Sequence, residues 1–151
     1  MPSKSRLMHH FEQEWRAAGQ DPRVVMKRVR QLLRSYQELA WRAALEEKRA
    51  NDANELASGR ALIASLLELA PLSTSPCQSY AAATALMRRT LAAVAHYPHN
   101  GALYHAILEG AYFRANPGGD SALWPELHIE RSTYYQRKQE AIALFGTLMQ
   151  K

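Results

Sequence analysis

The densest set of polar groups in this chain lies near its end, in the ten residues ERSTYYQRKQ at positions 130–139. They supply carboxylate, guanidinium, hydroxyl, phenol, amide and ammonium groups. Hydroxyl, amide and guanidinium groups are those that hydrogen-bond to the base edges, sugars and phosphates of nucleic acids. The apolar run AIALFGTLM follows at positions 141–149, after Glu140. This order is typical of one helix whose first turns contact a partner and whose later turns are buried.

A helix of 3.6 residues per turn would separate these side chains into two faces. The face expected to be buried holds Tyr134, Ala141, Leu144, Phe145 and Leu148. The outer face is expected to begin at Arg131 and to hold Ser132, Thr133, Tyr135, Gln136 and Gln139. Tyr134 should be a core residue whose hydroxyl reaches the edge of the core. The N–H groups at the helix start would favour an anion, and a solvated polar face without a partner is the structural alternative.

No set of residues in the sequence predicts catalysis or metal binding. The six histidines show no H-E-x-x-H spacing and no cysteine partner. Cys77, the one cysteine, has no adjacent histidine to activate it. The phosphate-binding pattern G-x-x-x-x-G-K-[ST] and the nucleophile pattern G-x-S-x-G do not occur. We therefore expect no enzyme activity, no metal and no cofactor.

Charge is distributed unevenly along the 151 residues, which carry a net charge of +5. Residues 1–42 hold nine Lys/Arg against four Asp/Glu, whereas residues 43–100 and 101–151 each hold five against five. A basic excess favours a polyanionic partner, although modest basicity also serves solubility. The polar start MPSKSRLMHHFEQEW has no apolar core of signal-peptide type, and no segment is typical of a membrane span. We therefore expect a cytoplasmic protein that does not associate with membranes.

The elements that position these residues should all be helices. Ala, Leu, Arg, Glu and Gln dominate, and alternating β-branched runs are absent, which predicts an all-α fold. A first helix is expected over Ser5–Ala18, ended by Gly19, and Asp21-Pro22 is a typical start for the next.

The second helix carries a narrow apolar seam and is expected to run to about residue 50. The seam residues recur at steps of four and three, and are Val25, Val29, Leu32, Tyr36, Leu39 and Ala43. Such a seam is either the core stripe of a monomer or the interface of a homodimer. Its opposite face carries Arg23, Lys27, Arg30, Arg34 and Gln37.

Later helices are expected at about 55–69, 79–96 and 102–115, then at 121–127 with Asp120 as its cap, and finally from Glu130 onward. Residues 1–70 would form an N-terminal helical arm, built as a long hairpin and able to dimerise. Residues 71–78 would be a linker, and 79–151 a helical region. The end of that region, about 102–151, has the arrangement of a helix-turn-helix, whose second helix enters the major groove with its N-terminal residues.

Two segments resemble ArpU/RinA-type phage transcription regulators. Residues 127–145, LHIERSTYYQRKQEAIALF, are similar to the family's C-terminal signature, roughly L-G-I-S-x-x-[ST]-Y-Y-x-x-[KR]-x-x-A, which itself resembles region 4 of sigma factors. Residues 29–39, VRQLLRSYQEL, are similar to its N-terminal pattern V-x-x-x-L-x-x-Y-x-x-L. Three positions differ from the family: His128 replaces the turn glycine, Glu130 replaces the capping serine, and Pro125 lies within the short helix.

The resemblance implies a double-stranded-DNA-binding transcription regulator that activates late genes of a phage or prophage. Its likeness to sigma region 4 suggests host RNA polymerase as a second partner. The DNA-contacting residues that it implies are Arg131, Ser132, Thr133, Tyr135, Gln136, Arg137, Lys138 and Gln139, with Lys138 and Gln139 on phosphates. Much of the positive charge for phosphate binding would come from the basic N-terminal helices. The alternative function is a helical phage assembly or adaptor protein that works through the Val25–Ala43 seam.

Overall fold

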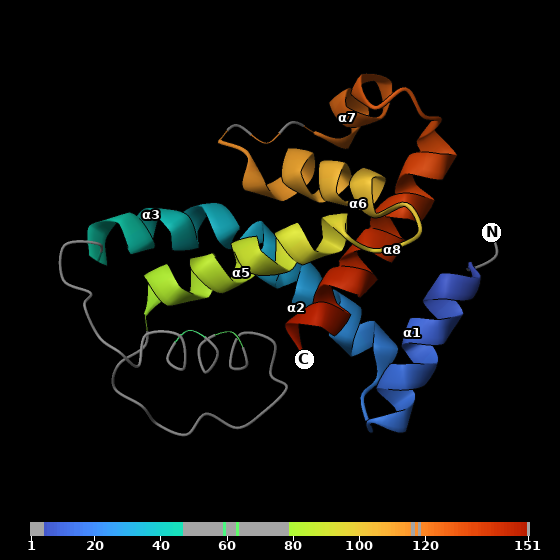
Figure 1. Cartoon of the computed structure of the whole chain (residues 1–151), viewed down its shortest axis with the longest axis horizontal. Helices are drawn as coiled ribbons and strands as arrows, with labels where there is room; N and C mark the ends of the chain where they lie inside the picture. Colours follow the sequence, from blue (N-terminus) through green and yellow to red (C-terminus); the bar gives the residue numbers. More distant parts are fainter. Residues whose placement is uncertain are drawn as a thin grey trace.

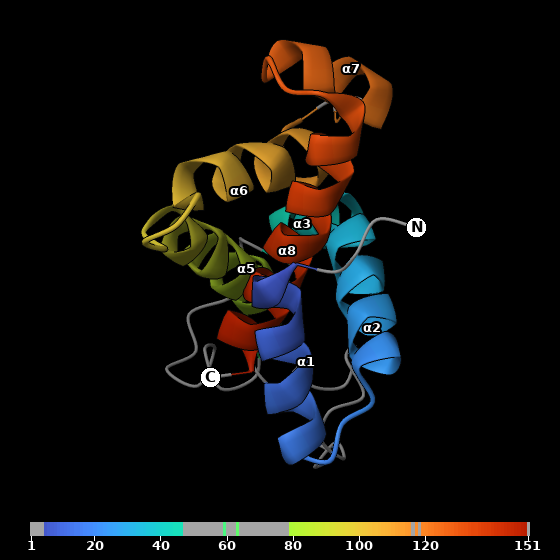
Figure 2. The same cartoon turned by 90° about the vertical axis from the view of Figure 1, so that its right-hand side faces the viewer.

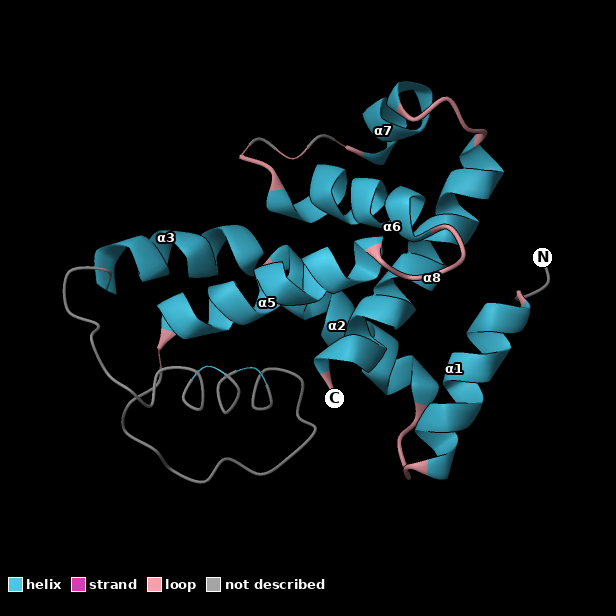
Figure 3. Ribbon diagram, in the orientation of Figure 1, coloured by secondary structure: helices cyan, strands magenta, loops and turns pink. Residues whose placement is uncertain are grey.

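The computed structural model is all-α, as the composition predicts (Figures 1 and 3). It describes residues 5–46, 59, 63, 79–115, 117 and 119–150. Every regular element within these ranges is a helix. None of the described helices combines the length and the apolar character needed to cross a membrane.

The first two helices form an antiparallel pair whose ends match the predicted signals. Helix α1 (Arg6–Ala17) begins after Ser5, whose side chain accepts a hydrogen bond from the N–H of Met8. It ends at Ala17, and Gly19, which follows the cap residue Ala18, has a φ of +80°. Helix α2 (Pro22–Arg34) is capped by the Asp21 carboxylate, which accepts a hydrogen bond from the Arg23 N–H at 3.0 Å.

The single helix expected from Pro22 to about residue 50 is divided in two, so this prediction was wrong. Helix α2 ends at Arg34, and helix α3 (Tyr36–Glu46) begins after Ser35. The Ser35 hydroxyl donates a 2.8 Å hydrogen bond to the Gln31 carbonyl. The Ser35 N–H donates to two carbonyls, those of Gln31 and Leu32. A serine that bonds to its preceding turn in this way bends a helix. Helix α3 therefore packs beside α5 (Tyr80–Ala95) (Figure 1).

The seam from Val25 to Ala43 faces the core of its own chain. All six of its residues are less than a tenth exposed. Helix α2 packs against α8 (Arg131–Met149), and α3 packs against α5. The seam is thus a core stripe, which was one of the two predicted roles, and it offers no exposed surface to a homodimer or an assembly partner. The expected second half of the hairpin, about 55–69, and the expected linker, 71–78, lie outside the described residues apart from Gly59 and Ile63.

Helix α8 is the central element of the fold. Figure 2 shows it between α5 and α6 (Gly101–Leu108) on one side and α1 and α2 on the other, and all four pack against it. Residues 141–147 of α8 are buried at every position, whereas residues 131–139 are largely exposed. The described helices of residues 1–70 consequently share one core with those of residues 79–151.

Helix α6 continues into a π-helical turn, Glu109–Phe113, so the helix expected at 102–115 is present with a wider final turn. The side-chain amide of Gln37 closes this turn. Its Nε2 donates to the carbonyls of Tyr112, Phe113 and Arg114 at 2.8–3.2 Å. These bonds tie the start of α3 to the end of the π-helical turn, just ahead of the segment that leads to α7 (Asp120–Glu126).

Candidate nucleic-acid interface

A tight connection joins α7 to the exposed start of α8. Beyond Leu127 the backbone turns at His128, which has a φ of +57°. The His128 N–H donates to the Pro125 carbonyl and the Ile129 N–H to the Trp124 carbonyl, both at 3.1 Å. This pair of bonds defines a Schellman motif, whose left-handed position is usually glycine. The position at which the family pattern has glycine is therefore left-handed, and a histidine occupies it.

Glycine at position 128 should stabilise the fold. We expect His128→Gly to raise the free energy of unfolding by up to about 1 kcal/mol in urea titrations. The left-handed conformation costs an L-residue about 1–2 kcal/mol, and the greater freedom of glycine in the unfolded chain offsets part of the gain.

Gly19 supplies the matched control, because α1 ends in the same motif. The Gly19 N–H donates to the Arg16 carbonyl at 3.0 Å and the Gln20 N–H to the Trp15 carbonyl at 2.8 Å. A Cβ at Gly19 would meet no atom within 4 Å, so Gly19→Ala tests conformation alone. It should lower the free energy of unfolding by about 1 kcal/mol. Two variants that shift stability in the same direction would contradict this account.

Asp120 links α7 to the second turn of α8. It was expected to cap α7, but Gly119 occupies the cap position without a side-chain bond, so this prediction was wrong. The Asp120 Oδ1 instead accepts a 2.6 Å hydrogen bond from the Tyr134 hydroxyl and a 2.8 Å bond from the Lys138 ammonium. A bond from an ammonium group is stronger than one from a backbone N–H, which explains where the carboxylate points.

The protonation states of Asp120 and Tyr134 favour the hydrogen bond between them. Burial alone would raise the pKa of Asp120, but the hydrogen bonds from Lys138 and Tyr134 outweigh burial and lower it. Burial, together with the neighbouring Asp120 carboxylate, raises the pKa of Tyr134. The phenol therefore stays protonated and donates. Tyr134 is fully buried and its hydroxyl reaches the half-buried Asp120, which confirms its predicted place.

Arg137 and Lys138, both expected to contact DNA, are engaged in intramolecular ion pairs. The Arg137 Nη1 lies 2.7 Å from Oε1 of Glu140, a residue only 1% exposed. The same Oε1 accepts a 3.1 Å hydrogen bond from the Tyr104 hydroxyl. The Lys138 side chain is 18% exposed, and its ammonium also lies 5.4 Å from the centre of the Tyr112 ring. The structure thus holds both cations against the protein itself.

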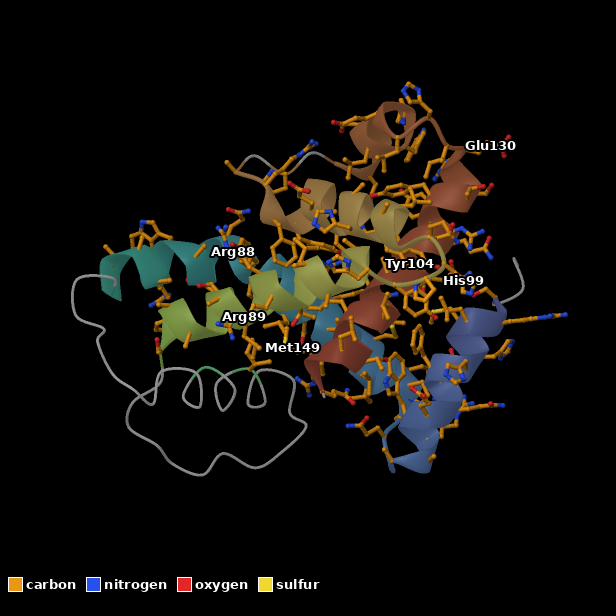
Figure 4. The ribbon with its side chains drawn as sticks, in the orientation of Figure 1. Arg88, Arg89, His99, Tyr104, Glu130 and Met149 are labelled. Atoms are coloured by element: carbon orange, nitrogen blue, oxygen red, sulfur yellow. The ribbon has the colours of Figure 1, made fainter. Side chains whose placement is uncertain are left out.

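The outer face of the first α8 turns is exposed as predicted. Arg131, Ser132, Tyr135, Gln136 and Gln139 are exposed, and Thr133 is half-buried. Glu130 precedes them as the N-cap residue of α8, and its side chain makes no cap hydrogen bond (Figure 4). Among the described residues, Arg131 makes no ion pair. Of the three cations expected to contact DNA, it alone is thus available to a partner.

Arg131 is positioned by two aromatic rings. Its guanidinium carbon lies 5.8 Å from the ring centres of both Trp124 and Tyr135. These rings are 5.9 Å apart, and Trp124 is also 6.0 Å from Tyr134. Cation–π contacts of this kind hold an arginine in place. Trp124 belongs to no recognisable sequence motif, and its only signal in the sequence is its position in the short helix ahead of the turn.

Comparison of the chain with protein-family models, with curated proteins and with solved structures gave no match in any of the three.

Proposed function

We propose that this chain is a DNA-binding transcription regulator that places the first turns of α8 in the major groove. The observation that carries the proposal is the exposed face of Arg131, Ser132, Tyr135, Gln136 and Gln139 on a helix whose residues 140–147 are all buried. A helix anchored in the core presents its exposed side chains rigidly, which favours specific recognition.

Each exposed side chain suits a particular contact in a groove. An arginine binds O6 and N7 of guanine with two hydrogen bonds, and glutamine makes the corresponding pair with adenine. We assign these roles to Arg131 and Gln136. Ser132, Thr133 and Tyr135 carry hydroxyls suited to base edges or sugars, and Gln139 suits a phosphate. Arg137 and Lys138 have no role in this assignment, because their charges are neutralised by Glu140 and Asp120.

The biological setting of the proposal rests on the resemblance to ArpU/RinA-type regulators. The chain would activate late genes of a phage or prophage in the cytoplasm of its bacterial host, with RNA polymerase as a second partner. His128 in the left-handed turn position supports this alignment, because the backbone there has the geometry that the family's glycine would adopt.

Arg131→Ala should weaken binding to a preferred duplex by about 1–3 kcal/mol and relax the sequence preference, because one base contact is lost. The probes are a duplex selected by the wild-type protein from a random-sequence pool, and the unselected pool itself. Affinities for both are measured by fluorescence anisotropy. The preference for the selected duplex should fall, while affinity for the pool changes little.

Arg89→Ala is the control for Arg131→Ala. Arg89 is exposed on α5, far from Glu130 at the N-terminal end of α8 (Figure 4). It should leave the preference unchanged. Equal effects of the two variants would remove Arg131 from base recognition. A wild-type protein that binds neither duplex at low salt would refute the proposed function.

A further inference from the structure

One face of α2 carries a row of four cations. Arg23, Lys27, Arg30 and Arg34 follow one another at steps of four, three and four, a spacing that places them on one side of a helix. At a rise of 1.5 Å per residue the row is about 16 Å long. Helix α2 holds no acidic residue, and its other side is buried in the core. The row therefore lies on the outer surface of the molecule.

Three of the four cations in the row form no ion pair with a described carboxylate. Lys27, Arg30 and Arg34 have no described carboxylate within ion-pair distance. Arg23 lies 3.9 Å from Asp21, and both side chains are exposed, so water and salt screen this pair. Like charges three or four residues apart repel one another along a helix. This state contrasts with the cations Arg137 and Lys138 of α8, which are each bound by a carboxylate.

One end of the row lies beside the α7–α8 unit. The charge of Arg34 is one of the causes that lower the pKa of Asp120, although burial opposes them. Asp120 is itself bonded to Tyr134 and Lys138 of α8. Helix α2 also packs against α8 (Figure 2). Three residues beyond Arg34, Gln37 donates to the Tyr112 carbonyl at 3.0 Å, and the Tyr112 ring centre lies 5.4 Å from the Lys138 ammonium. The Arg34 end of the row is therefore the end nearer to the second turn of α8.

We propose that the row Arg23–Lys27–Arg30–Arg34 binds the DNA backbone beside the groove that α8 enters. This inference rests on the proposed function and extends it to the source of affinity. Each strand of B-DNA carries one phosphate per 3.4 Å of axis, so a row of about 16 Å extends past about five phosphates of one strand. Phosphate contacts position a protein on DNA, and base contacts select the sequence. The row supplies the first kind of contact and the start of α8 the second.

The test removes three charges of the row in one variant, Lys27→Gln/Arg30→Gln/Arg34→Gln. Binding to the random-sequence duplex pool and to the selected duplex is measured over a salt series. Each phosphate contact contributes about 0.9 to the slope of log affinity against log salt, so the slope should become less steep by about 2.7. Affinity for both duplexes should fall by the same factor, which leaves the sequence preference intact.

A matched variant removes three exposed charges elsewhere, Arg42→Gln/Arg88→Gln/Arg89→Gln on α3 and α5. It separates the loss of net charge from the loss of local contacts, and its salt slope should stay close to that of the wild-type protein. Equal slopes in the two triple variants would overturn the inference. Circular dichroism checks folding. If the triple row variant is unfolded, the single variants Lys27→Gln and Arg34→Gln should each change the slope by about 0.9, and an unchanged slope in both overturns the inference.

The sequence preference and the salt slope together distinguish a failure of base recognition by α8 from a failure of phosphate binding by the row. If the row variant matches its control while Arg131→Ala still relaxes the sequence preference, the row is refuted and the function stands. If the row variant lowers the slope while Arg131→Ala leaves the preference unchanged, recognition by α8 is refuted and the row stands. A wild-type protein that binds no duplex at low salt refutes both.

Discussion

Phe145→Ala should lower the free energy of unfolding by about 3–5 kcal/mol, because the lost burial and the remaining cavity both destabilise the fold. Phe145 is fully buried in the later half of α8. Its ring centre lies 6.0 Å from that of Phe113, which in turn lies 4.4 Å from Tyr36. The truncation therefore opens a gap where α8, the π-helical turn and the start of α3 meet. Urea denaturation followed by circular dichroism measures the loss.

Trp41→Ala is the control for this substitution. Trp41 is also a large aromatic side chain, but it is 62% exposed on α3. Its truncation should change the free energy of unfolding by about 0.5 kcal/mol or less, as is usual for exposed positions. A loss below about 1 kcal/mol for Phe145→Ala would contradict the central position of α8 in the core.

Gly146→Leu should destabilise the fold by about 3 kcal/mol, at the upper end of the range for overpacked cores. Gly146 lies where α8 packs against α2. A Cβ at this position would come within 2.6 Å of Cγ2 of Val29, a residue with no exposed surface. The branched side chain of Val29 has no free rotation that would make room. A leucine at 146 must therefore push α2 away from α8, and urea denaturation measures the cost.

A double-mutant cycle tests the origin of this effect. Val29→Ala removes the methyl group that a residue at 146 would meet, so it should relieve part of the damage in the Gly146→Leu background. We expect a coupling energy of about 1 kcal/mol or more, as for other residues in direct contact. Strictly additive effects would place the conflict elsewhere. Gly119→Ala, where the nearest described atom to a new Cβ is 3.9 Å away, should cost only about 1 kcal/mol or less, because its one penalty is the loss of a glycine at the N-cap of α7.

The all-α class and several helix ends could be predicted from sequence because their signals are local. Ser5, Gly19, Asp21 and Ser79 each act within one turn of the chain, and each lies at the helix boundary that it predicts. The bend at Ser35 could not be predicted. The apolar seam continues across it without interruption, whereas the bend arises from a serine side-chain bond and from the packing of α3 on α5.

The candidate site shows the same division between local and distant causes. The helical periodicity correctly predicted that Tyr134 is buried and that the outer face from Arg131 to Gln139 is exposed. Periodicity places a side chain on a face, but it does not show which charges are neutralised. Lys138 is bonded to Asp120, eighteen residues earlier in the chain, and no local sequence signal indicated this ion pair. DNA binding itself remains a prediction for experiment.

The central position of α8 has a consequence for the newly made chain. A ribosome releases the N-terminal residues first, so α1, α2, α5 and α6 all emerge before the helix against which they pack. The parts of their apolar surfaces that pack against α8 have no partner there until residues 141–149 have been synthesised. A product that stops short of these residues would expose those surfaces to chaperones and proteases. A chain that lacks the last turns of α8 therefore cannot complete this core.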